Sequence, residues 1–156
     1  MPMLTIDEQQ EIEAQYPRYA TKQGASVEAL KIVQRRCGWV SDEDVKEVAA
    51  FLDMPYEELE GVATFYNLVF RRPVGRHTIL ICDNVSCWIT GYRPIRDALI
   101  TRLGAELGET TADKRFTLLP IPCLGACDHA PAMMVGLDLH GDLQVDQIDA
   151  ILQKYE

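Results

Sequence analysis

The segment that decides the fold of the second half of the chain is residues 77–87, which read His-Thr-Ile-Leu-Ile-Cys-Asp-Asn-Val-Ser-Cys. Its first five residues form a short β-branched and apolar run, which is typical of a strand. The strand signal ends at Cys82, and Cys87 follows after four intervening residues. The segment therefore predicts a strand whose exit loop carries two cysteines.

A second segment repeats this design further along the chain. Residues 116–121 predict another strand, and Cys123 and Cys127 follow it, separated by three residues. If the two strands are neighbours in one sheet, both cysteine loops emerge at the same edge. Four thiolates could then converge on one site.

The rest of the second half supplies the other parts of a small α/β layer. We expect a helix over residues 92–103, a third strand over 133–135, a turn at Gly141-Asp142 leading to a fourth strand, and a closing helix over 145–155. This order suits helices packed on a mixed sheet.

The first half has the period of helices instead. We expect helices over residues 5–16, 26–38 and 41–52 and a fourth that begins at Pro55, with capping signals at Thr5, Ser26 and Ser41. The fourth helix should carry an apolar stripe made of Leu59, Val62, Ala63, Phe65 and Tyr66. Its aromatic residues, Phe65, Tyr66 and Phe70, are more than a short helix needs to pack one side, so burial in the core and docking of a partner both stay open for them. Residues 71–75 break the pattern and predict a solvated linker. The prediction is an α+β chain, with a helical domain over 1–75 and an α/β domain over 76–156.

Composition excludes several classes of function. The 156 residues carry a net charge of −9, and neither half is basic, so nucleic acid is not an expected partner. No apolar run approaches the ~20 residues of a membrane helix, and the N-terminus has no signal-peptide pattern. We expect a cytoplasmic chain, in which thiols stay reduced and five cysteines indicate metal binding or redox chemistry before disulfides.

Spacing alone leaves two metal sites open. A 2Fe–2S cluster takes four cysteine thiolates, and a structural zinc ion accepts the same four ligands with similar loops. Two disulfides are disfavoured by the compartment, and a thioredoxin-like redox dithiol would need Cys-x-x-Cys, which the sequence lacks.

Other candidate groups carry less weight. Cys37 stands far from the other cysteines in sequence, and we expect it to behave as a small apolar residue. His129 lies two residues after Cys127 and is expected to be a solvated loop histidine, because a Rieske-type site needs two histidines on one iron. Neither dinucleotide nor phosphate-loop fingerprints are present, so no catalytic residue is assigned.

Taken together, the motifs resemble one family over nearly the whole chain. The matching stretches are Gly-Val-Ala-Thr-Phe-Tyr at 61–66, Arg-Pro-Val-Gly-Arg-His at 72–77, Cys82-x₄-Cys87, Thr110-Thr111 before Arg-Phe-Thr-Leu at 115–118, and Cys-Leu-Gly-Ala-Cys at 123–127 with Ala130-Pro131. They resemble the thioredoxin-like 2Fe–2S subunit of the NADH dehydrogenase module of bacterial NADH:quinone oxidoreductase, respiratory complex I.

The resemblance implies a helical bundle followed by a thioredoxin-like ferredoxin domain. It implies that Cys82, Cys87, Cys123 and Cys127 hold one 2Fe–2S cluster. It further implies that the chain belongs to an enzyme complex but is not catalytic alone, and that it is peripheral to the inner membrane, with no direct membrane insertion. Its partners would be a subunit that binds NADH, FMN and a 4Fe–4S cluster, and further complex I subunits. The same motifs also suit soluble NAD-linked formate dehydrogenases and hydrogenases.

Overall fold

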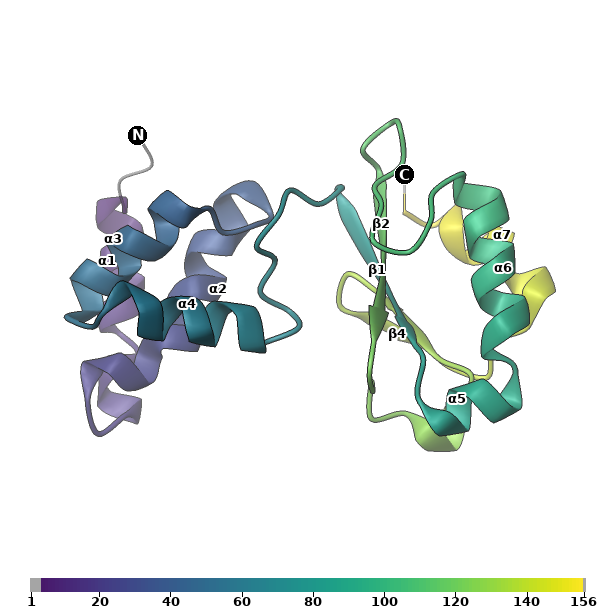
Figure 1. Cartoon of the computed structure of the whole chain (residues 1–156), viewed down its shortest axis with the longest axis horizontal. Helices are drawn as coiled ribbons and strands as arrows, with labels where there is room; N and C mark the ends of the chain where they lie inside the picture. The colour runs from purple at the N-terminus through teal and green to yellow at the C-terminus, as the bar shows by residue number, and fades with distance from the viewer. Residues whose placement is uncertain (1–3, 156) are drawn as a thin grey trace. The chain divides into compact units, whose positions relative to one another are not determined.

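The computed structural model describes residues 4–155, and the chain forms two compact units. The first unit ends at Pro73 and is helical, and the second begins at Val74 and contains the sheet (Figure 1). The fold is therefore α+β, as predicted. The domain limits of 1–75 and 76–156 stay a prediction, although Gly75 packs with the second unit, where its backbone N–H donates to Thr117 Oγ1 at 2.6 Å.

Over residues 4–73, the helical unit contains four α-helices and two short 3₁₀ turns. The α-helices are α1 (Ile6–Glu13), α2 (Ser26–Cys37), α3 (Asp42–Leu52) and α4 (Tyr56–Phe65), and the 3₁₀ turns span Tyr16–Arg18 and Lys22–Ala25. The predicted capping boxes of α1 and α3 are present, because Thr5 pairs with Glu8 and Ser41 with Asp44. Ser26 is not a cap; it lies inside α2, and Ala25 precedes the helix.

The core of this unit is formed by the inward faces of the four helices, as the apolar spacing predicts. Leu59 and Ala63 of α4 are fully buried. Of the two roles left open for Phe65 and Tyr66, burial in the core is not observed: they are 77% and 45% exposed. The helix ends at Phe65, and Tyr66 has extended backbone angles, so the helical period no longer sets which way these side chains point.

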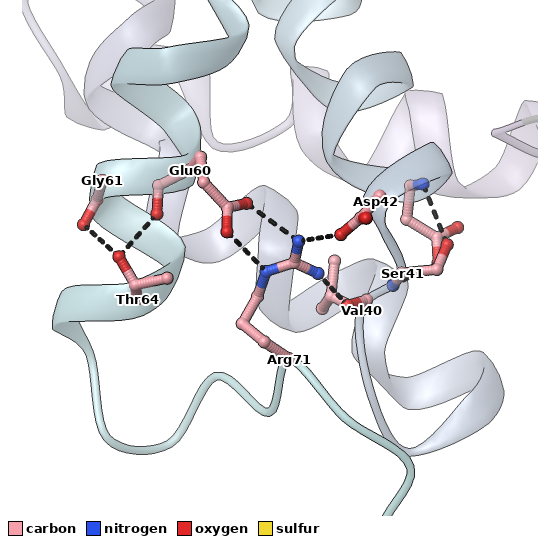
Figure 2. A network of polar contacts seen from close by, with 8 residues as sticks. Val40, Ser41, Asp42, Glu60, Gly61, Thr64 and Arg71 are labelled. Carbon is pink, nitrogen blue, oxygen red and sulfur yellow. Dashed lines mark hydrogen bonds and ion pairs between the residues drawn. The ribbon is translucent and has the colours of Figure 1, made fainter.

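Arg71 corrects the prediction that residues 71–75 are a solvated linker. Its side chain is only 14% exposed, and its guanidinium lies between the carboxylates of Asp42 and Glu60, at 2.6 and 2.8 Å (Figure 2). The same guanidinium donates to the carbonyl of Val40. Arg71 thus fixes the end of the helical unit to the start of α3 and to α4.

The second unit is a four-stranded mixed sheet with helices. Its elements are β1 (His77–Cys82), α5 (Val85–Thr90), α6 (Tyr92–Leu103), β2 (Phe116–Ile121), a 3₁₀ turn (Cys127–His129), β3 (Met133–Val135), β4 (Asp138–His140), a second 3₁₀ turn (Val145–Gln147) and α7 (Ile148–Leu152). The strand order is β2-β1-β3-β4, with β1 and β2 parallel and the other pairs antiparallel.

The two faces of the sheet are buried differently. Ile79 and Ile81 of β1 belong to the core beneath α6 and α7, which lie on one face (Figure 1). Leu80 and Cys82 alternate with them and therefore point to the opposite face, where they pack in a smaller apolar cluster. The cysteine region is thus built on the face that α6 and α7 do not cover.

Two predictions for the second unit need correction. The fourth strand, β4, precedes Gly141-Asp142 rather than following it, and the hairpin turns at Gly136, which has a positive φ of 60°. The closing helix over 145–155 is shorter than expected, because only Ile148–Leu152 is α-helical. Among the described residues, no helix is both long and apolar enough to cross a membrane.

Candidate metal centre

The parallel register of the first two strands brings the cysteine loops to one edge of the sheet. Cys82 is the last residue of β1 and pairs with Ile121, the last residue of β2. Cys123 follows Ile121 by two residues. Since the carboxyl ends of parallel neighbours lie at the same edge, both loops leave the sheet together, as the sequence predicts if these strands are adjacent.

Cys82 and Cys87 are buried in the same apolar cluster, at 2% exposure each. Cys87 was expected in a loop but lies in the short helix α5. The side chain of Asn84 caps this helix by accepting a hydrogen bond from the N–H of Val85 at 2.7 Å. The helix turns Cys87 inward, so one turn of structure positions the second sulfur of this pair.

Cys123 and Cys127 form the exposed half of the site. The backbone N–H of Gly125, between them, points at Cys123 Sγ from 3.3 Å. Such N–H contacts to cysteine sulfur are a feature of iron–sulfur sites, where they tune the potential. Cys127 opens a 3₁₀ turn that is closed by a hydrogen bond from His129 N–H to the carbonyl of Ala126.

The pKa of Cys87 shows how the buried sulfurs interact. Burial raises this pKa to about 11, and the neighbouring thiols of Cys82 and Cys127 contribute to the rise, while a backbone hydrogen bond from Ala132 opposes it. Three of the four cysteines therefore lie close enough to influence one another. The thiolates of the two buried cysteines, Cys82 and Cys87, would need a compensating positive charge, which a bound metal centre would supply.

The donor set fits a 2Fe–2S cluster. All five cysteines are free, and four of them sit on the two loops that share one sheet edge. Within residues 4–155, no three Cys, His, Asp or Glu side chains close around a single point as ligands of one ion. A 2Fe–2S cluster does not require that arrangement, because its four thiolates are divided between two irons.

The remaining candidates lie outside this arrangement. Cys37 ends α2 and is exposed, which corrects the expectation that it behaves as a small apolar residue. His129 is exposed as expected, and its Nδ1 lies 2.7 Å from Asp142 Oδ2. The hydrogen bond to Asp142, together with the charges of Asp128 and Asp142, raises the pKa of His129.

Sequence reasoning missed two features of the site. It did not foresee the helix that carries Cys87, although Asn84 is a good N-cap residue. It also did not foresee that the backbone of Ala132 contacts both buried cysteines. The carbonyl of Ala132 accepts a hydrogen bond from Cys82 N–H at 3.1 Å, and its backbone also forms a hydrogen bond with Cys87. No local signal reveals Ala132, because the contact depends on the antiparallel pairing of β1 with β3.

The second unit is an α/β domain with four cysteines on two loops at one edge of its sheet. These features place it in the class of iron–sulfur electron carriers. The chain belongs to the thioredoxin-like 2Fe-2S ferredoxin family, whose sequence model matches residues 9–156. This confirms the family resemblance and the thioredoxin-like fold, and one 2Fe–2S cluster is the cofactor of this family.

Full-length relatives agree with this assignment. The chain is 46% identical over 153 residues to a component of the NADH-quinone oxidoreductase of Pseudomonas aeruginosa, covering 98% of this chain and 92% of that protein. It is equally similar, at 46% over the same coverage, to the component of the same name from Escherichia coli K12. Among solved structures, an NAD+-reducing NiFe hydrogenase matches with a TM-score of 0.63 and 26% identity, over 72% of this chain and 20% of that chain.

Proposed function

We propose that this chain is the electron-transfer subunit of an NADH:quinone oxidoreductase of the respiratory complex I type. The observation that carries the proposal is the meeting of two cysteine loops at one sheet edge, in a chain of this family. The relatives named as components of NADH-quinone oxidoreductase, similar over 92% of their length, support this assembly over the others.

The proposed ligands of the cluster are Cys82, Cys87, Cys123 and Cys127. A bound 2Fe–2S cluster would supply the capacity to accept and release one electron at a time. The protein's part is to hold two sulfurs in an apolar cluster, to aim the N–H of Gly125 at a third, and to exclude water from the buried pair.

The partner that we propose is a subunit that binds NADH and FMN and carries a 4Fe–4S cluster, together with further subunits of the complex. NADH oxidation is a two-electron hydride transfer, and this chain offers no dinucleotide fingerprint for the nicotinamide. The proposed location is the cytoplasmic side of the inner membrane, where the chain is held through the complex.

A second assembly has its own support. The likeness to an NAD+-reducing NiFe hydrogenase supports an NAD-linked hydrogenase as the alternative. A soluble NAD-linked formate dehydrogenase, the other alternative, rests on the motif resemblance alone. Identity separates the two, since it is 26% to the hydrogenase and 46% to the quinone oxidoreductase components. The proteins that co-purify with this chain distinguish them directly.

The test of the proposed function is electron flow from NADH to ferricyanide. The chain alone should show no appreciable activity. When the flavin-bearing subunit is added, activity should appear and the cluster should become partly reduced. As a matched control, the flavin-bearing subunit is combined with the Cys82→Ala variant, which lacks one proposed ligand. Robust NADH oxidation by the chain alone, with no flavin present, would contradict the electron-carrier proposal.

A further inference from the structure

The outer face of α5 is a small exposed apolar patch. Val85, Trp88 and Ile89 are 65%, 46% and 77% exposed. Their spacing of three and four residues places all three on one side of the helix. The helix, Val-Ser-Cys-Trp-Ile-Thr, has no charged residue at all, so solvation does not explain why these side chains face outward.

The same helix turns Cys87 to its opposite side. Cys87 is buried with Cys82, while the patch residues before and after it point to solvent. A helix with its side chains is about 10 Å across. A protein seated on this patch would therefore lie about one helix thickness from the proposed cluster ligand.

Arg93 gives the patch a charged border. Its guanidinium lies over the ring of Trp88, 4.7 Å from the centroid, and Trp88 stacks on Tyr92 with centroids 5.3 Å apart. Arg93 is exposed, and within the described part of the chain no carboxylate forms an ion pair with it.

The helix dipole does not account for this arginine. It occupies the first turn of α6, where the helix dipole favours negative charge and disfavours a cation. Aromatic and arginine side chains beside apolar ones are, however, the composition of the centre of protein interfaces. The chain as a whole is acidic, with a net charge of −9, so an unpaired arginine at this place selects for a partner carboxylate.

We infer that Val85, Trp88, Ile89 and Arg93, here called the α5 patch, form the docking surface for the flavin-bearing subunit. This inference rests on the proposed function. Single-electron exchange needs the partner's redox group close to the cluster, and the α5 patch is the outer surface of a helix that holds one ligand. The partner surface would be an apolar groove bordered by a carboxylate that pairs with Arg93.

The test uses the cluster-loaded chain and measures its affinity for the flavin-bearing subunit by calorimetry. Ile89→Asp places a charge in the apolar contact and should raise Kd by at least about tenfold. The matched control is Leu137→Asp, because Leu137 is 91% exposed in the turn between β3 and β4. The EPR signal of the reduced cluster should be the same in both variants, which shows that the site is intact.

A second variant tests the charged border. Arg93→Glu suits the first turn of α6 and should leave folding unchanged. It should weaken binding and reduce the dependence of Kd on salt concentration, since an interfacial ion pair is lost. Unchanged affinity in both Ile89→Asp and Arg93→Glu would overturn the inference while leaving the proposed function in place.

Two further outcomes separate the inference from its premise. If the unaltered chain does not bind the flavin-bearing subunit at all, the proposed function is wrong. The inference about the α5 patch is then wrong as well, because it rests on that function. If size-exclusion chromatography with light scattering shows a dimer of this chain that Ile89→Asp dissociates, the patch joins two copies, and the inference is overturned.

Discussion

Cys82 lies beside Ile121 in the parallel register of β1 and β2, and Ile121 stands two residues before Cys123. This pairing means that a single hydrogen-bonded ladder determines where both cysteine loops begin. The buried pair, Cys82 and Cys87, and the exposed pair, Cys123 and Cys127, therefore approach the same edge from neighbouring strands. The proposed metal centre depends on this geometry.

The first prediction concerns the ligands. Replacing Cys82, Cys87, Cys123 or Cys127 by Ala should greatly reduce or abolish cluster content, because one iron would lose one of its two protein thiolates. Iron content and visible absorption of the purified variants measure this. Cys37→Ala is the matched control and should keep the cluster, since Cys37 ends α2 and is not a proposed ligand. Bleaching by Cys37→Ala alone would show that the ligand assignment is wrong.

The second prediction concerns Arg71. Arg71→Ala should lower the free energy of unfolding of the helical unit by about 2 kcal/mol, because Glu60 and the carbonyl of Val40 lose a part-buried partner (Figure 2). Arg72→Ala is the control and should cost less than about 0.5 kcal/mol, because Arg72 is exposed. Urea denaturation of both variants gives the comparison. Equal stabilities would mean that the ion pairs around Arg71 contribute nothing net.

Much of the fold could be predicted because local signals and tertiary structure agree. The capping boxes at Thr5 and Ser41 and the strand runs before Cys82 and Cys123 are determined by nearby residues. The order of these elements, and the spacing of the cysteines, then restrict the fold further. Family resemblance added the cofactor, which spacing alone left open between iron–sulfur and zinc.

Two of the errors, at Gly141-Asp142 and at Arg71, come from long-range packing. Gly141-Asp142 is a turn signal, but in the structure these residues pack against the 3₁₀ turn that begins at Cys127 and do not lead into a strand. A Cβ on Gly141 would lie 2.6 Å from His129 Cβ, so glycine is needed for this close packing. Asp142 N–H then donates to the carbonyl of His129. The sequence shows that a turn is present but not which segment packs on it. Arg71 was likewise misassigned because its carboxylate partners are distant in sequence.

The third prediction concerns pH and the half-buried histidine His77. Burial lowers its pKa from the ordinary 6.5, and the charges of Arg76 and Arg115 lower it further. The folded state thus favours the neutral ring, whose contribution to stability is complete above about pH 6.5 and is lost as the pH falls below that value. The contribution of His77 to the unfolding free energy should therefore decline on acidification through this range.

The variant His77→Phe isolates this effect. Phenylalanine keeps the aromatic contacts with Phe116 and Tyr155 and removes a ring nitrogen, Nε2, that is buried without a hydrogen-bond partner among the described residues. Denaturation at about pH 7.5 and about pH 5.5 should show a smaller loss of stability for the variant than for the unaltered chain. The same loss in both proteins would contradict the assignment to His77.

The fourth prediction concerns docking by the helical unit. Phe65 is 77% exposed and meets Tyr66 edge-to-face, with ring centroids 5.3 Å apart, at the end of α4. We expect this pair to contact the flavin-bearing subunit, so Phe65→Ser should raise Kd by at least about tenfold. Ile6→Ser, at a residue 72% exposed on α1, is the control within the same unit. Full affinity in the Phe65 variant would remove the docking role of this aromatic pair.

The central claim is that the four cysteines of the two sheet-edge loops hold one 2Fe–2S cluster. The most direct measurement is the metal and sulfide content of the purified chain, combined with its EPR spectrum after reduction. We expect about two irons and about two acid-labile sulfides per chain, which is the composition of one 2Fe–2S cluster. After reduction, the EPR spectrum should show the signal of one unpaired spin. Bound zinc without iron, in a colourless protein with no such signal, would contradict the claim.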